Sequence, residues 1–197
     1  DMHRNGKIRM MNTSPIRTIA DLRRVYTPGV AEVCNLIREQ PIWKDAYTMI
    51  PYTVAIVTDG TRILGLGDIG PVAGMPVMEG KAALLQALAG VSGVPILLDT
   101  SDDDEIVDTI KHISPTFGGV HLEDIASPRC FYILDRLEHE LDIPVIHDDQ
   151  QATAVVALAA MINGCKQAGV DPKNATIGLI GLGAAGLSIG RLLLEYT

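Results

Sequence analysis

Apolar positions along the chain follow two spacings, one typical of helices and one typical of buried strands. Two helical patterns, 18–25 and 29–37, come first and are separated by Pro28-Gly29. From residue 53 onward, β-branched runs alternate with helical patterns. Strands are expected at 53–58, 94–98, 119–122, 144–147 and 176–180, and helices at 81–88, 104–112, 128–141, 153–168 and after a glycine turn near the end. This alternation predicts an α/β fold with a mainly parallel sheet covered by helices.

Three local signals refine this pattern. Asp59-Gly60 predicts a hairpin turn after the first strand. Ser127 is expected to cap the helix that begins at Pro128, since proline favours the first helical position. The glycine-rich stretch 65–70 is expected to be a loop that shapes a substrate pocket.

Length and composition narrow the class of protein. The 197 residues leave room for one full domain and part of a second. The net charge is −8 and no run of lysine or arginine occurs, which argues against a nucleic-acid partner. No apolar stretch approaches the ~20 residues of a membrane span. The three cysteines have no zinc-site spacing, and no signal-peptide pattern opens the chain, so we expect a cytoplasmic protein.

Acidic residues follow two of the expected strands. Glu123 and Asp124 come after 119–122, and Asp148 and Asp149 come after 144–147. Ligands bind beyond the carboxyl ends of strands in open α/β sheets, and neighbouring strands lie ~4.8 Å apart. Carboxylates brought together there need a cation, and oxygen ligands suit Mg²⁺ or Mn²⁺. The alternative is that each acid only caps the helix that follows it.

Two further side chains could take part in acid/base chemistry. Lys81 stands at an expected helix start, where the helix dipole and partial burial would lower its pKa and suit it to act as a base. Tyr26 precedes a turn at Pro28-Gly29. Taken alone, Lys81 is more simply explained as an exposed lysine, and Tyr26 as a core or surface tyrosine.

A glycine fingerprint lies near the end of the chain. Gly181, Gly183 and Gly186 form GxGxxG between the expected strand 176–180 and a helix, which is the context of a dinucleotide-binding turn. The helix N-terminus behind such a turn faces the cofactor pyrophosphate. The chain therefore carries signals for a divalent cation, an anionic substrate and a dinucleotide.

Together these segments resemble malic enzyme, and the short form of the lysine motif resembles its bacterial branch. The matching stretches are 26–30, 58–70, 76–81, 121–125, 147–154 and the glycine turn 181–186. The resemblance implies an amino-acid-dehydrogenase-like N-terminal domain with a parallel sheet over 1–148. It also implies that 149–197 begins a Rossmann NAD(P)-binding domain, and that the protein is a homodimer.

The implied reaction is the oxidative decarboxylation of malate to pyruvate and CO₂, with NAD or NADP reduced and Mn²⁺ or Mg²⁺ bound. By resemblance, the metal ligands are Glu123, Asp124 and Asp149, with Asp148 next to them. Lys81 matches the general base, Tyr26 the general acid and Arg62 a substrate-carboxylate ligand. The three fingerprint glycines, Gly181, Gly183 and Gly186, match the pyrophosphate site.

The chain departs from the family pattern at Ala152, where glycine usually precedes Thr-Ala. Because the chain starts at Asp1 and ends within a helical pattern, we expect an N-terminal portion that is inactive alone. Alternatives are a malolactic enzyme, which converts malate to lactate, and a catalytically silent fragment. An amino-acid dehydrogenase shares the two-domain plan but has no use for the two acidic doublets.

Overall fold

A four-stranded parallel sheet forms the centre of the computed structural model, which describes residues 3–197. Its strands are β1 (Thr53–Thr58), β2 (Ser92–Leu97), β3 (Gly119–Leu122) and β4 (Val145–His147). Their order is β2-β1-β3-β4, and every neighbouring pair runs parallel. The predicted α/β fold with a parallel sheet is confirmed.

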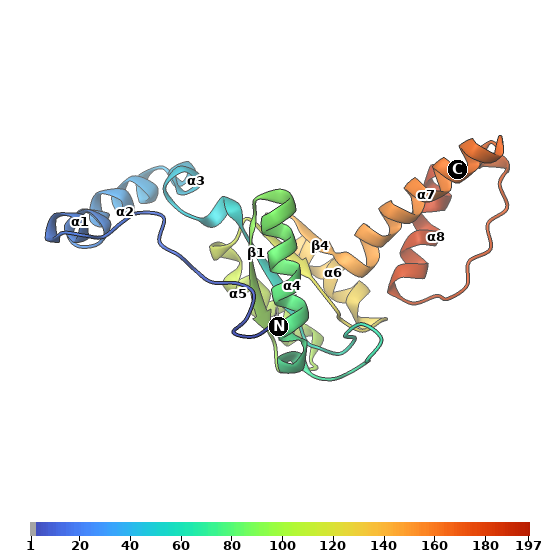
Figure 1. The fold of residues 1–197 in the computed structure, drawn as a ribbon, viewed down its shortest axis with the longest axis horizontal. Coiled ribbons are helices and arrows are strands. Elements are labelled where there is room, and N and C mark those ends of the chain that lie inside the picture. Colours follow the sequence, from blue (N-terminus) through green and yellow to red (C-terminus); the bar gives the residue numbers. More distant parts are fainter. Residues whose placement is uncertain (1–2) are drawn as a thin grey trace.

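Helices surround the sheet and extend beyond it on both sides (Figure 1). They are α1 (Ile19–Val25), α2 (Val30–Glu39), α3 (Lys44–Tyr47), α4 (Pro71–Ala89), α5 (Asp103–Ile113), α6 (Arg129–Glu140), α7 (Thr153–Ala168) and α8 (Ala184–Tyr196). Helices α1 to α3 form an arm at one side of the sheet, and α7 and α8 pack on each other at the opposite side. A turn of π-helix, Asp148–Ala152, joins β4 to α7.

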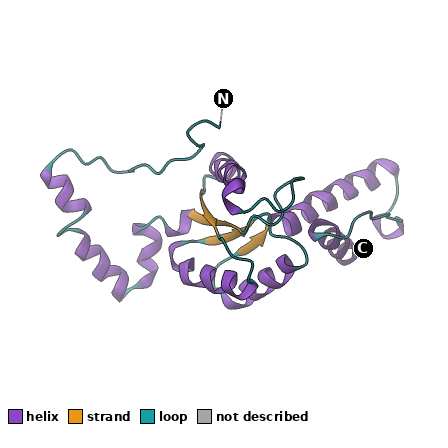
Figure 2. Cartoon of the chain, turned by 90° about the horizontal axis from the view of Figure 1, so that it is seen from below, coloured by secondary structure: helices purple, strands orange, loops and turns teal. Residues whose placement is uncertain are grey.

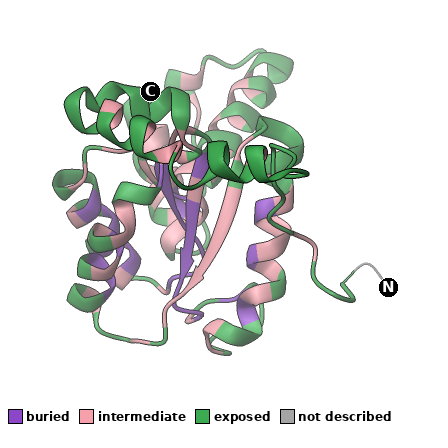
Figure 3. Cartoon of the chain, turned by 90° about the vertical axis from the view of Figure 1, so that its left-hand side faces the viewer, coloured by how far each residue is buried: buried purple, intermediate pink, exposed green. Residues whose placement is uncertain are grey.

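The two faces of the sheet are covered by different helices, as Figure 2 shows. Alternate residues of a strand point to opposite faces. Ala55 and Val57 of β1 therefore pack with buried residues of α5 and α6, whereas Ile56 packs with Met78 and Ala82 of α4. Burial is concentrated in these strands and the helix faces turned toward them (Figure 3).

Helix α4 begins at Pro71, ten residues before the predicted start at 81. The predicted hairpin turn at Asp59-Gly60 is also wrong, because both partners of β1 are parallel to it. Gly60 instead brings the loop close to the start of α4. A Cβ atom there would lie 2.2 Å from the carbonyl carbon of Gly70, and the φ of Gly60 is +72°. Only glycine fits both the conformation and the close approach.

The predicted strand at 176–180 is not formed, and the segment has no regular structure. A strand is stabilised by hydrogen bonds to a neighbour, and none of β1 to β4 pairs with this segment. The predicted Ser127 cap is wrong as well. The N–H of Cys130 donates to the backbone oxygen of Ala126, so the first turn of α6 uses backbone rather than the Ser127 hydroxyl.

Over residues 3–197, no helix combines the length and the apolar character needed to cross a membrane.

Candidate active site

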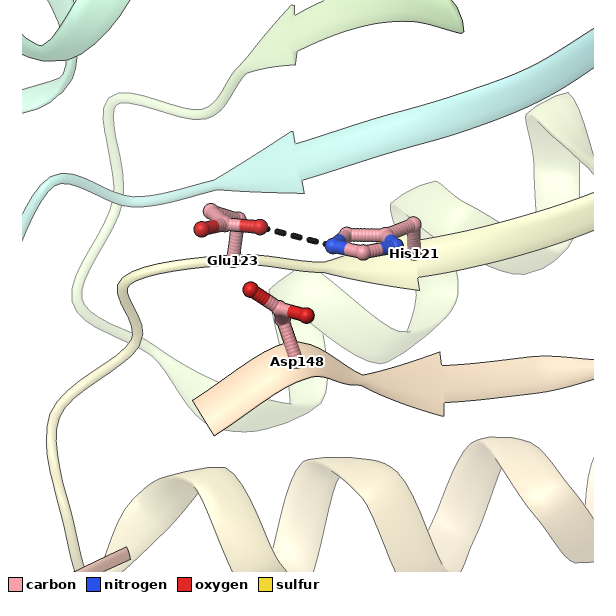
Figure 4. Close-up of side chains that lie close together, drawn as sticks. All are labelled: His121, Glu123 and Asp148. Atoms are coloured by element: carbon pink, nitrogen blue, oxygen red, sulfur yellow. Dashed lines mark hydrogen bonds and ion pairs between the residues drawn. The ribbon is translucent and has the colours of Figure 1, made fainter. Parts of the chain in front are cut away.

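The two acidic doublets meet at the carboxyl edge of the sheet. Strands β3 and β4 are neighbours, and Leu122 pairs in register with His147. The next residues, Glu123 and Asp148, therefore leave adjacent strand ends side by side. Figure 4 shows the Asp148 side chain pointing toward Glu123, whose carboxylate is paired with His121. The placement predicted from the strand ends is confirmed for these two acids.

Lys81 reaches this cluster from α4. Its Nζ atom lies 2.5 Å from Oδ2 of Asp148 and 3.3 Å from Oε2 of Glu123. The lysine lies in the interior of α4 and not at its start, so the positive end of the helix dipole does not lower its pKa as predicted. The structure thus joins the lysine to the acids through salt bridges.

The charge state of Lys81 also differs from the expectation. Burial lowers the pKa of its ammonium group, but the hydrogen bond to Asp148 and the charge of Glu123 outweigh burial. The net effect raises the pKa of Lys81 above its usual value. In the metal-free protein the side chain is therefore an ammonium ion held by two carboxylates, and the predicted lowering of its pKa is wrong.

The other acid of each doublet lies beside the first, with Asp124 buried and Asp149 half-buried. Burial, Glu123 and Asp149 raise the pKa of the Asp124 carboxyl to about 6. Burial is also the main cause that raises the pKa of Asp149, followed by the charges of Glu123 and Asp148. The environment of each of these carboxyls therefore disfavours its negative charge. A bound cation would stabilise the charged form of both groups.

The donor set fits a hard divalent cation. Asp124 is 5% exposed, and its Oδ2 atom is buried without a hydrogen-bond partner. Burying a carboxylate oxygen without a partner costs folding free energy unless a proton or a cation binds to it. Oxygen ligands of this kind are those that Mg²⁺ and Mn²⁺ prefer. Glu123, Asp124 and Asp149 could hold such an ion, with Asp148 next to them.

His121 belongs to the cluster but was given no role from the sequence. Its Nε2 atom lies 2.6 Å from Oε2 of Glu123. Ligand atoms of His121, Glu123 and Asp148 all lie within 4.8 Å of one another. The period of two along β3 was the available signal, because it places residues 121 and 123 on the same face. Here His121 holds Glu123 in position.

The loop after β1 lies against the acidic segment. The backbone N–H of Arg62 donates to the Asp124 carbonyl at 3.0 Å, while the Arg62 side chain is exposed. The glycine-rich stretch 65–70 continues this loop and is closed by a bridge between Ile63 and Gly67. Arg62 is therefore next to the cluster, where an anionic substrate could reach it.

Tyr26 is placed elsewhere. It ends α1, on the arm that Figure 1 shows away from the sheet, and the residue is 67% exposed. Within a single chain, the described structure does not bring Tyr26 to Lys81. No sequence pattern predicted this, since the direction of the arm depends on residues distant in sequence.

The glycine fingerprint keeps its turn although the preceding strand is not formed. Gly181 has a φ of +98°, and α8 starts directly after Gly183. A Cβ atom on Gly186 would lie 1.9 Å from the carbonyl oxygen of Gly181, so the turn requires glycine at that position. The close approach is the one expected of a dinucleotide-binding turn.

Comparisons with known proteins identify the family of the chain. Residues 5–138 match the family model described as "Malic enzyme, N-terminal domain". The chain is 64% identical to NAD-dependent malic enzyme 1 of Bacillus subtilis (strain 168), over 98% of this chain and 44% of that protein. It is 49% identical to the bifunctional malic/malolactic enzyme of the same organism, over 97% of this chain and 47% of that protein.

Solved structures give the same result. The crystal structure of malic enzyme from Pyrococcus horikoshii Ot3 superposes with a TM-score of 0.95 at 50% identity, covering 98% of this chain and 44% of that one. The NAD-dependent malic enzyme of Thermotoga maritima gives 0.96 at 44% identity, covering 99% and 52%. The chain thus spans less than half the length of the curated relatives named above. On the family match and these similarities, the chain belongs to the malic enzyme family.

Proposed function

We propose that the protein containing this chain oxidises malate and decarboxylates it to pyruvate and CO₂, with reduction of NAD or NADP and with Mn²⁺ or Mg²⁺ bound. The observation that carries this proposal is the contact of Lys81 with Glu123 and Asp148 at the carboxyl edge of the sheet. A base candidate there touches the group of acids that could hold a divalent cation. The relatives' names include both NAD-dependent and NADP-dependent malic enzymes.

In this proposal, Glu123, Asp124 and Asp149 hold the cation and Asp148 orients Lys81. When bound, the cation would supply Lewis-acid polarisation of the substrate oxygen. Lys81 takes the proton from the malate hydroxyl at its Nζ atom, which requires that the amine first become neutral. The two carboxylates that raise its pKa in the metal-free protein belong to the same cluster, so the base and the ion site are coupled.

Other residues bind substrate and cofactor. The exposed Arg62 side chain would pair with a carboxylate of malate, as a guanidinium can do with two hydrogen bonds. Gly181, Gly183 and Gly186 would let the backbone approach the cofactor pyrophosphate. We propose that 149–197 begins the dinucleotide-binding domain and that 1–148 is the substrate and metal domain.

Tyr26 would protonate the enol carbon formed after CO₂ leaves. We also propose a homodimer, because the arm that carries Tyr26 exposes apolar residues such as Ile19 and Leu22. If a second copy packs on the arm, the Tyr26 of one chain could reach the active site of the other. The unpaired cysteines support a cytoplasmic location.

The experiment is product analysis with the intact protein, L-malate, Mn²⁺ and either NAD⁺ or NADP⁺. We expect equal amounts of pyruvate, CO₂ and reduced cofactor. Lactate without net reduced cofactor would instead support the malolactic alternative. That alternative is retained because the chain is similar to a bifunctional malic/malolactic enzyme. If neither pyruvate nor lactate is formed, both candidate functions are refuted.

A further inference from the structure

Two loops at the carboxyl edge of the sheet are tied together by hydrogen bonds. They follow β1 and β3 and comprise residues 59–64 and 123–128. The N–H of Ala126 donates to the Thr61 hydroxyl at 2.9 Å, and the N–H of Arg62 donates to the Asp124 carbonyl at 3.0 Å. The position of the acidic segment therefore depends on the position of the β1 loop.

A buried ion pair organises the β1 loop. The Asp59 side chain is fully buried, and its Oδ1 atom accepts from both the N–H and the hydroxyl of Thr61, at 3.1 and 2.7 Å. Its Oδ2 atom lies 2.9 Å from NH1 of Arg129, the first residue of α6. The Nε atom of Arg129 also donates to Asp103 of α5 at 2.6 Å. A buried carboxylate needs such a countercharge.

The segment held by this network is strained. Asp124 has a φ of +56° and Leu64 a φ of +47°, both in the left-handed region that side chains other than glycine rarely adopt. The backbone of Leu64 lies close enough to the Asp124 carboxylate to lower its pKa, so the two strained residues are neighbours. Such conformations persist only when the surroundings hold them.

We propose that Arg129 is a positioning residue for the metal site. Through Asp59 and Thr61 it holds the β1 loop against Asp124 and thereby fixes the orientation of the Asp124 carboxylate. Its described ion pairs are with Asp59 and Asp103, and none is with Lys81 or with an acid of the cluster, so it acts only through this chain of contacts. The inference rests on the proposed cation site formed by Glu123, Asp124 and Asp149.

The test is Mn²⁺ binding to the intact protein without substrate or cofactor, measured by titration with detection of free Mn²⁺ by electron paramagnetic resonance. Arg129→Met is compared with Arg136→Met. Arg136 is a matched control because it also lies on α6 and pairs with an acid of α5, Asp104, at 2.9 Å. Loss of a group that orients metal ligands typically costs about 10–100-fold in affinity. We expect such a loss for Arg129→Met and none for Arg136→Met.

Two further variants keep the test decisive if Arg129→Met does not fold. Thr61→Val removes the hydroxyl between the two loops while leaving the ion pair, and it should also weaken Mn²⁺ binding. Arg129→Lys keeps the charge and should restore part of the affinity. Wild-type affinity in folded Arg129→Met and Thr61→Val would overturn the positioning role alone. Absence of Mn²⁺ binding by the wild-type protein would overturn the proposed cation site as well.

Discussion

Lys81 and Asp148 are 67 residues apart in the sequence, yet their side chains form a hydrogen bond of 2.5 Å at the edge of the sheet. Helix α4 supplies the lysine, and the π-helical turn that follows β4 supplies the acid. Because Asp148 fixes the Nζ atom, the amine stays next to Glu123, where the substrate hydroxyl is expected. The contact therefore links the proposed base to the proposed ion site.

Replacing Lys81 should remove catalysis without removing the fold. We expect Lys81→Met in the intact protein to lower kcat for malate oxidation by about 10²–10⁴-fold, the range for loss of a general base. The matched control is Lys111→Met, because Lys111 also pairs with an acid, Glu140, but away from the cluster. Steady-state kinetics of both variants test this. Comparable activity in Lys81→Met and Lys111→Met would contradict the role of the lysine.

The raised pKa of Asp124 predicts a pH-dependent stability effect in the metal-free protein. The folded value of about 6 exceeds the ordinary 3.8, so the group favours folding below about pH 4 and this contribution is lost as the pH rises through 6. At pH 7.5, Asp124→Asn should therefore stabilise the metal-free protein by up to about 3 kcal/mol, because the pKa shift from 3.8 to about 6 corresponds to 1.36 kcal/mol per pKa unit. Asparagine also tolerates the left-handed backbone there.

Thermal or urea unfolding in the presence of a chelator, at pH 4 and pH 7.5, measures this difference. The stabilisation should vanish at the lower pH, where Asp124 is protonated in the wild type. Asp142→Asn, an exposed acid outside the cluster, serves as the control. Destabilisation by Asp124→Asn at pH 7.5 would show that the carboxylate is not under electrostatic stress.

Gly186 should be essential for dinucleotide binding. A methyl group there would meet the Gly181 carbonyl oxygen at 1.9 Å, so Gly186→Ala must displace the turn. We expect the KM for the dinucleotide to rise about tenfold or more, since small displacements of a binding group are costly. In Gly190→Ala the new methyl group would lie 3.4 Å from a Leu179 side-chain carbon, and the KM should be little changed. Equal KM values for both variants would argue against this turn as the cofactor site.

Tyr26→Phe should reduce turnover without affecting stability, because the side chain is exposed on the arm. Loss of the proton donor should lower kcat by about 10²-fold or more. Tyr47→Phe is the control, since Tyr47 is an exposed tyrosine of the same arm. The kinetics are to be measured together with the melting temperature. Unchanged kcat in Tyr26→Phe would remove Tyr26 from the proposed mechanism.

The sequence predicted the elements whose patterns are local. The bounds of β1, β3 and α7 match the expected ranges, because β-branched runs and helical spacing are clear there. The first half of α4 was missed because Pro71 to Gly80 is rich in proline and glycine. In that segment, packing against the rest of the protein determines that the chain is helical. Gly74 lies so close to Ile63 that a Cβ atom would approach its side chain to 2.7 Å. Tertiary contact thus overrides low helix propensity.

The part of the candidate site that lies at the strand ends could be predicted from the sequence. Adjacent parallel strands bring Glu123 and Asp148 together, and this followed from the expected topology. The ion pair of Asp59 with Arg129 had no local signal, because it joins a strand end to a helix 70 residues later. The placement of Tyr26 likewise depends on how the arm leaves the sheet. Long-range contacts of this kind leave no periodicity in the sequence.

The most direct measurement of the central claim is the metal dependence of malate oxidation by the intact protein and by Asp149→Asn. After treatment with a chelator, the wild type should form no pyruvate, and added Mn²⁺ should restore pyruvate and reduced cofactor in equal amounts. Asp149→Asn should stay inactive at the same Mn²⁺ concentration, whereas the control Asp142→Asn should recover. Full activity of the chelated wild type, or recovery of Asp149→Asn equal to that of the control, would contradict the account.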